Sequence, residues 1–284
     1  MGARGIGLLL LGLLGAFVAA SLLVFWLAVH PPRLAIPLSP RDYRLAPETV
    51  TIAAEDGVTL AGWLLPRPGA PAVVLLHGYP AEKADLLPLA AALAPDFAVL
   101  LMDLRFFGQS EGRVTTLGLR ERGDLRRAID FLAARGHPEV AVFGLSLGGA
   151  IALTTAGEDA RIRAVAAYAP FSDLRSLAHE LYAWMGLLKY PLVELTMFWG
   201  RLFLGGDISR PSPEAAAARL SVPVLLIHSR ADEQIPFGHA ERLRAALQDN
   251  PRARFVFMER GRHGELPPGF DRQLAQFFRS AFGG

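Results

Sequence analysis

Three residues that could form a nucleophilic triad stand far apart in the sequence. Ser146 lies in GLSLG (144–148), a G-x-S-x-G pattern. Asp232 follows a later apolar run in SRADEQIP, and His263 follows another in RGRHGE. A serine hydroxyl is a weak nucleophile, so it needs a histidine base and a carboxylate that orients the histidine. The order serine, aspartate, histidine is expected when all three lie on loops at the carboxyl edge of one sheet.

The residues around Ser146 are typical of a sharp strand-to-helix turn. An apolar run at 140–143 predicts a buried strand, and small apolar residues after Ser146 predict a helix. A serine held in an unfavourable backbone region tolerates no bulky neighbour two residues away, which explains Gly144 and Gly148. The helix N-terminus also favours negative charge. We predict that Ser146 is the nucleophile; the alternative is a serine in a glycine-rich packing joint.

Buried strands and amphipathic helices must place these residues. Residues 49–66 predict an antiparallel hairpin that turns at Glu55-Asp56-Gly57. Continuous apolar runs separated by helices then indicate a mostly parallel sheet with helices on both faces. These runs are at 72–76, 97–102, 140–143, 162–168, 222–229 and 254–259. Together with the hairpin they predict an α/β fold with an eight-stranded sheet.

Residues 48–284 resemble the α/β-hydrolase superfamily. LLHGYP (75–80) resembles its His-Gly oxyanion turn, and DLRFFGQSEG (103–112) resembles its D-x-R-x-x-G-x-S loop. The segments HGYPAEKADLLPLA and TTLGLRERGDLRRAIDFL are most similar to membrane-anchored bacterial hydrolases of the lysophospholipase-like and serine-aminopeptidase-like group. Many relatives have R-G-x-G-x-S where this chain has RFFGQS (105–110). We therefore expect Phe106 to line or crowd the substrate cleft.

The oxyanion hole needs two N–H donors. The N–H of Leu147, directly after the nucleophile, is the first, and the resemblance implies the N–H of Tyr79 as the second. His77 belongs to the His-Gly turn, so we expect it to have a structural role. Asp103 competes for the role of the acid because it also ends a strand, but its D-x-R loop predicts an ion pair with Arg105.

Residues 171–213 interrupt the strand–helix alternation and carry many aromatic side chains. We expect a helical cap insertion in which Trp184 and Trp199 line an apolar substrate cleft. The alternative is that these aromatic side chains only pack the insertion onto the domain.

The first thirty residues predict a membrane anchor. Residues 5–29 are an unbroken apolar run, longer than the about 20 residues that span a bilayer. A cleaved signal peptide is the alternative, although its apolar region is roughly 7–15 residues long. The expected organisation is an anchor (1–30), a stiff proline-rich linker (31–47) and a catalytic domain (48–284). We expect the domain to be extracytoplasmic because a very short tail usually stays inside, although the arginine distribution does not favour export.

Composition excludes several classes of protein. The net charge is +2 with charges of both signs interspersed, so we expect no nucleic-acid partner. The chain has no cysteine, and its histidines form no H-E-x-x-H pair, so we expect no metal site. The predicted function is a cofactor-free serine hydrolase that cleaves apolar or lipid-like acyl esters of small molecules, with no obligate protein partner. The alternatives are a serine peptidase or amidase, and a catalytically silent membrane-tethered interaction module.

Overall fold

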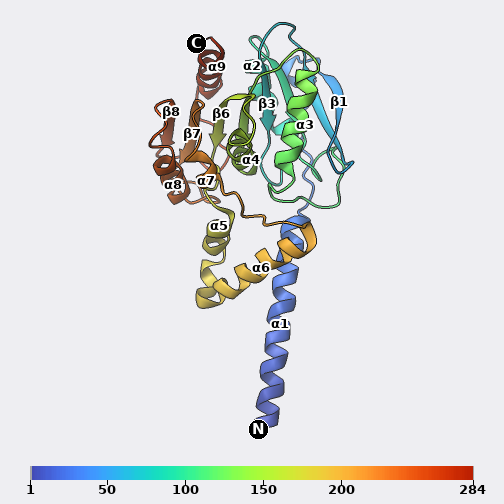
Figure 1. The fold of residues 1–284 in the computed structure, drawn as a ribbon, viewed down its shortest axis with the longest axis vertical. Coiled ribbons are helices and arrows are strands. Elements are labelled where there is room, and N and C mark those ends of the chain that lie inside the picture. The colour runs from blue at the N-terminus through green and yellow to red at the C-terminus, as the bar shows by residue number, and fades with distance from the viewer. Residues whose placement is uncertain (1, 284) are drawn as a thin grey trace.

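The predicted sheet is present in the computed structural model, which describes residues 2–283. The β1/β2 and β2/β4 pairs are antiparallel and all other pairs are parallel, which confirms the expected mostly parallel sheet (Figure 1). In spatial order the strands are β1 (Glu48–Ala53), β2 (Thr59–Leu65), β4 (Ala98–Met102), β3 (Ala72–Leu76), β5 (Val140–Leu145), β6 (Ile162–Tyr168), β7 (Val224–Ser229) and β8 (Ala253–Met258).

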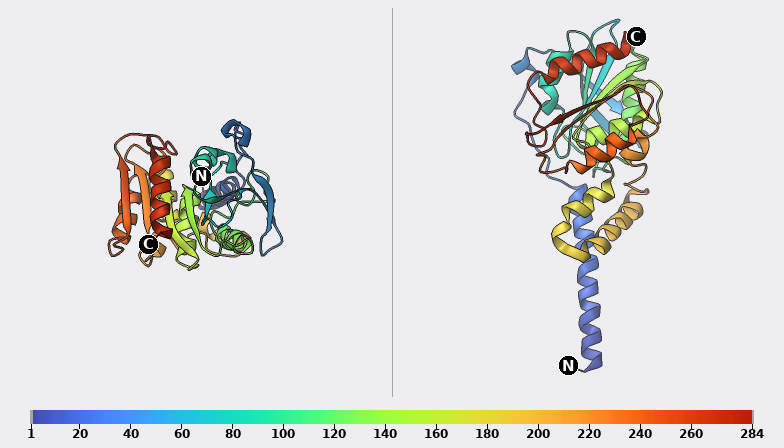
Figure 2. Two further views of the ribbon diagram at one scale, coloured as in Figure 1. Left: turned by 90° about the horizontal axis from the view of Figure 1, so that it is seen from above. Right: turned by 90° about the vertical axis from the view of Figure 1, so that its left-hand side faces the viewer.

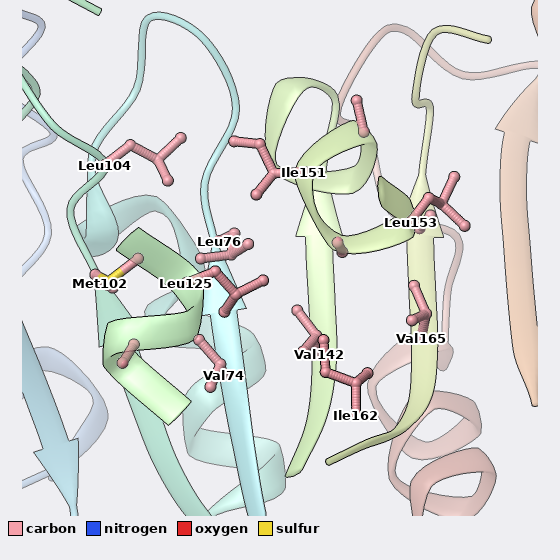
Figure 3. Packing of buried hydrophobic residues seen from close by; sticks show 14 of the residues in the cluster. Val74, Leu76, Met102, Leu104, Leu125, Val142, Ile151, Leu153, Ile162 and Val165 are labelled. Atoms are coloured by element: carbon pink, nitrogen blue, oxygen red, sulfur yellow. The ribbon is translucent and has the colours of Figure 1, made fainter. Parts of the chain in front are cut away.

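Helices cover both faces of the sheet because the central strands are apolar on both sides. On β3, Val74 and Leu76 join the core under one set of helices, whereas Val73 and Leu75 join the core on the opposite face. Figure 3 shows Val74, Leu76 and Ile151 packed together on the first face. The first set of helices is α3 (Glu121–Ala133), α4 (Leu147–Ala156) and α8 (Gly238–Ala246), with the short α7 (Pro213–Ala217) beside α4; the second is α2 (Leu87–Leu93) and α9 (Phe270–Phe282).

The expected insertion of helices lies between β6 and β7. It contains α5 (Leu174–Leu181), a 3₁₀ segment (Ala183–Leu188) and α6 (Lys189–Leu204). The carboxylate of Asp173 caps α5 by accepting a hydrogen bond from the Ser176 N–H at 2.7 Å. Figure 2 shows these helices at the end of the domain from which α1 (Ala3–Val29) projects. We call α5, the 3₁₀ segment and α6 the cap.

The N-terminal helix α1 is long and apolar enough to cross a membrane. Its C-terminal part packs against α6, which crosses it (Figure 1). The segment 31–47 that follows is not a free-standing spacer. Ile36, Leu38, Tyr43 and Leu45 are partly buried against the core beneath α2 and α9. The linker therefore lies along the α/β domain.

Candidate active site

Ser146 occupies the turn between β5 and α4 with φ 52° and ψ −114°. Positive φ is strained for a residue with a side chain, and here it directs the serine out of the strand-to-helix turn. A Cβ at Gly144 would lie 2.2 Å from the carbonyl atoms of Gly148. A Cβ at Gly148 would lie 2.5 Å from the Leu76 carbonyl oxygen. Both positions therefore require glycine, for the steric reason that the sequence suggested.

The structure brings Asp232 and His263 together from the loops after β7 and β8. His263 Nδ1 lies 2.7 Å from Asp232 Oδ2. The other carboxylate oxygen accepts the N–H groups of Gln234 and Ile235 at 2.9 and 2.8 Å. Burial raises the pKa of Asp232, but the hydrogen bonds from His263 and Ile235 outweigh it and hold the pKa below its ordinary value. An ionised Asp232 favours the Nδ1–H tautomer of His263, which leaves Nε2 free to act as a base.

Ser146 makes no side-chain hydrogen bond within residues 2–283. The structure thus joins the proposed acid to the proposed base, while the serine hydroxyl is unbonded. Catalytic hydrogen bonds are often long before substrate binds.

Two further contacts hold the loop that carries His263. The Tyr168 hydroxyl at the end of β6 donates to the Glu265 carbonyl oxygen at 2.5 Å. The Glu233 carboxylate, next to Asp232, accepts the His263 N–H at 3.1 Å. These contacts join the His263 loop to β6 and to the loop after β7. No spacing pattern in the sequence pointed to either contact.

Two backbone N–H groups near Ser146 are available as donors. Within residues 2–283, neither Tyr79 nor Leu147 donates its backbone N–H to another group. Leu147 is the first residue of α4, where N–H groups have no partner inside the helix. Gly78 brings the Tyr79 turn close, because a Cβ there would lie 3.3 Å from the Ser146 Cβ. The arrangement can hold an oxyanion formed at Ser146.

The remaining polar residues of the predicted motifs hold the loops in place. His77 is fully buried; Nδ1 lies 2.7 Å from the Gly78 carbonyl oxygen and Nε2 accepts the Leu104 N–H at 3.0 Å. It therefore links the Tyr79 turn to the loop after β4, in the structural role expected for it. Desolvation lowers the pKa of His77, which keeps the ring neutral in this role.

The expected ion pair between Asp103 and Arg105 is wrong. Asp103 pairs with Lys83, whose Nζ lies 2.5 Å from Oδ2, while Arg105 pairs with Asp124 at 2.6 Å. Lys83 is 1% exposed, and a buried ammonium group needs a carboxylate partner. Asp103 also accepts the N–H groups of Lys83 and Gln109 at 2.8 and 2.9 Å. These contacts occupy both oxygens of Asp103 and leave Asp232 as the carboxylate bonded to His263.

A cavity of about 460 Å³ lies beside Ser146. Its wall is formed by the Tyr79 turn, the loops after β6 and β7, the cap and α1. Within residues 2–283 no aspartate, glutamate, lysine or arginine lines it. The side chains that line it include Phe171, Leu174, Leu177, Ala178, Leu181, Tyr182, Thr196, Met197, Ile208, Gln234 and Ile235. Such a wall suits an apolar group attached to the reacting carbonyl.

The three predicted substrate-binding residues are not on this wall, which corrects that expectation. Phe106 packs on Phe107 and under Arg33. Trp184 is 80% exposed, and Trp199 donates its Nε1–H to Ser21 Oγ on α1 at 3.0 Å. Apolar residues occur on more than one face of α6, and the cavity is lined by its Thr196 and Met197 instead.

Sequence reasoning missed the contribution of α1 to the cavity. Val24, Leu27 and Ala28 of this helix line it. In the sequence they belong to a uniformly apolar run, so no signal set them apart from residues that face lipid. Among the described residues, 2–283, no cluster of histidine, aspartate and glutamate has the arrangement of a metal site.

Comparisons with known proteins agree with this architecture. A family model described as alpha/beta hydrolase fold matches residues 71–197. The YfhR protein of Salmonella typhi, named as uncharacterized, is 30% identical over 255 residues, which are 82% of this chain and 79% of that protein. The Rv2307c protein of Mycobacterium tuberculosis, also named as uncharacterized, is 32% identical over 210 residues, 72% of this chain and 68% of that one. The Pyrococcus furiosus esterase Pf2001 superposes with a TM-score of 0.71 at 22% identity, covering 89% of this chain and 99% of the esterase.

Proposed function

Because the chain belongs to the alpha/beta hydrolases, we propose that it is a serine hydrolase that cleaves acyl esters with apolar or lipid-like acyl groups. Ser146 is the nucleophile, His263 the base and Asp232 the acid that orients it. The N–H groups of Leu147 and Tyr79 form the oxyanion hole. The observation that carries this proposal is the Asp232–His263 hydrogen bond, in a chain whose strained serine faces an apolar cavity.

The acylation half of the reaction forms an acyl-enzyme. His263 Nε2 takes the Ser146 hydroxyl proton while Oγ attacks the ester carbonyl carbon. The carbonyl oxygen becomes an oxyanion that accepts hydrogen bonds from Leu147 and Tyr79. When the tetrahedral intermediate collapses, the bond to the alcohol breaks and His263 gives the proton to the leaving oxygen. The acyl group is then bonded to Ser146.

The deacylation half of the reaction regenerates the free enzyme. His263 takes a proton from water, whose oxygen attacks the acyl carbonyl, and the same oxyanion hole holds the second intermediate. Its collapse breaks the bond to Ser146 Oγ, which recovers the proton from His263. The acid is released, and this sequence of steps uses no cofactor.

An ester substrate fits the cavity better than a peptide with a free amino terminus. An aminopeptidase needs a carboxylate that binds the substrate ammonium group, and no acidic side chain lines the cavity within residues 2–283. An acyl chain gains free energy by leaving water for the apolar wall. We therefore keep the peptidase or amidase as the alternative and prefer an ester.

We further propose that residues 5–29 are retained as a single-pass membrane anchor. Ser21, Phe25 and Val29 are buried against the rest of the protein. Cleavage near residue 30 would expose the surfaces that they cover. We also propose that the catalytic domain is extracytoplasmic.

Labelling with a fluorophosphonate probe tests the proposed chemistry. The parent in detergent should be labelled, and Ser146→Ala should be unlabelled and lose kcat by about 10⁶-fold, the loss seen where triads have been dissected. p-Nitrophenyl esters of increasing chain length, assayed beside aminoacyl amides, separate an esterase from an amidase. A folded parent that is neither labelled nor active would support the silent interaction module instead.

A further inference from the structure

The last turns of α1 lie against the cavity that contains Ser146. Val24, Leu27 and Ala28 line the same cavity as the nucleophile. Figures 1 and 2 show α1 beside the cap, with its N-terminal part projecting away from the domain. Removing α1 would therefore open one side of the cavity as well as detach the protein from a membrane.

Hydrogen bonds hold this part of α1 from two directions. The Tyr79 hydroxyl donates to the Ala28 carbonyl oxygen at 3.1 Å. From the cap, Trp199 Nε1–H donates to Ser21 Oγ at 3.0 Å. Burial raises the pKa of the Tyr79 phenol, so the hydroxyl keeps the proton that it donates. The position of α1 at the cavity is thus fixed by the proposed oxyanion turn and by α6.

The length of α1 places the cavity near the surface of a bilayer. Its 27 residues extend about 40 Å, whereas the hydrocarbon layer is about 30 Å thick. The excess of about 10 Å corresponds to about seven residues, and all three cavity-lining residues lie among the last six, 24–29. The cap beside them exposes an apolar surface that includes Trp184, Leu187, Leu188, Phe198, Leu202 and Phe203. An exposed patch of this kind next to a membrane helix is suited to contact with lipid.

We propose that α1 is part of the substrate-binding site and that the substrate is an acyl ester resident in the membrane. The acyl chain passes from the bilayer into the space between α1 and the cap, and Val24, Leu27 and Ala28 form one wall of its binding site. The carbonyl group then lies at Ser146. This inference rests on the proposed serine-hydrolase function, because it assigns the acyl group of that reaction to the cavity.

Matched substitutions on α1 test its role in binding the chain. Leu27 and Leu23 are one turn apart and are 52% and 55% exposed, but only Leu27 lines the cavity. The full chain in detergent is assayed with p-nitrophenyl decanoate and acetate. Leu27→Trp and Val24→Trp should lower the decanoate-to-acetate ratio of kcat/KM by about tenfold or more, since each displaced methylene is worth about fourfold. Leu23→Trp should keep the parent ratio.

Alanine substitutions at the same two leucines test the inference if the tryptophan variants fail to fold. Leu27→Ala should lower the same ratio about threefold, through lost apolar contact with the chain, and Leu23→Ala should not. Fluorophosphonate labelling verifies a folded site in each variant. Equal ratios in the Leu27 and Leu23 variants would overturn the inference while leaving the esterase intact. A parent that neither hydrolyses acetate nor binds the probe would instead refute the function on which it rests.

Entry from the bilayer has its own test. The parent is reconstituted in phosphatidylcholine vesicles, and p-nitrophenyl palmitate is added either to those vesicles or to a separate population. Turnover should be at least tenfold faster when enzyme and ester share one bilayer. Equal initial rates in the two arrangements would show that the ester reaches the site through water, and the proposed route would be abandoned.

Discussion

Replacing Gly148 with alanine should damage catalysis through the backbone of the oxyanion turn. The added Cβ would lie 2.5 Å from the Leu76 carbonyl oxygen and 2.7 Å from that of His77. Ordinary contact begins at 3.4 Å, so α4 and the turn after β3 must move apart by about 0.9 Å. That turn carries the Tyr79 N–H. Since loss of one oxyanion donor costs about 10²–10³ in kcat, we expect Gly148→Ala to lose that much with little change in KM.

The assay compares two glycines at opposite ends of α4. At Gly157 a Cβ would meet its nearest atom at 3.5 Å, and φ there is −74°. Gly157→Ala should therefore keep kcat for p-nitrophenyl acetate within about twofold of the parent. Overpacking should destabilise Gly148→Ala by about 1–3 kcal/mol, so circular dichroism must verify folding at the assay temperature. Parent-like kcat in Gly148→Ala, or an equal loss in both variants, would refute this reasoning.

Three other predictions concern the acid, the packing of α1 and the membrane orientation. The pKa of Asp232 in the folded protein is lower than its ordinary value of 3.8. The charge of Asp232 therefore stabilises the fold above pH 3.8, and this stabilisation is lost as the pH falls through the folded pKa. The Tm gap between the parent and Asp232→Asn should therefore be present at about pH 5 and should close as the pH falls further. Trp199→Phe removes the hydrogen bond to Ser21 and should lower the free energy of unfolding by about 1 kcal/mol. Ser21→Ala should then cost less in the Trp199→Phe variant than in the parent, and full additivity in thermal melts would contradict the contact. The chain has no cysteine, so Gln248→Cys, but not Gly2→Cys, should react with an impermeant maleimide in intact cells if the domain is extracytoplasmic.

The sequence allowed prediction of features that depend on steric exclusion and chain order. Gly144 and Gly148 were assigned to the turn because bulkier residues cannot fit, and the structure has backbone atoms at 2.2 and 2.5 Å from the missing Cβ positions. The loops of Asp232 and His263 were placed by the apolar strands before them. Since parallel strands end at one edge, the order of strands was enough to bring these two residues together.

Ion-pair partners and cavity walls could not be predicted in the same way. Asp103 has Arg105 two residues away in the sequence, yet it pairs with Lys83. The ammonium group of Lys83 is buried, and a buried charge needs a partner of opposite charge. Trp184 and Trp199 were assigned to the cleft by residue type and by a spacing that can place them on helix faces. The face of a cap helix that meets the cavity depends on how the helices cross. Because these helices are apolar on several faces, the spacing of apolar residues does not indicate which face that is.

Tyr79 joins α1 to the α/β domain, two parts of the molecule that the sequence presented as independent. Its backbone N–H is a proposed oxyanion donor, and its hydroxyl bonds to the carbonyl of Ala28 on α1. The last turn of a helix leaves carbonyl groups without partners inside the helix, so α1 offers this acceptor only where it ends. The end of α1, the proposed oxyanion turn and the cavity beside Ser146 therefore meet at one residue. Movement of α1 relative to the domain would displace a cavity wall and strain the turn together, so direct contact couples the proposed membrane anchor to the proposed substrate site.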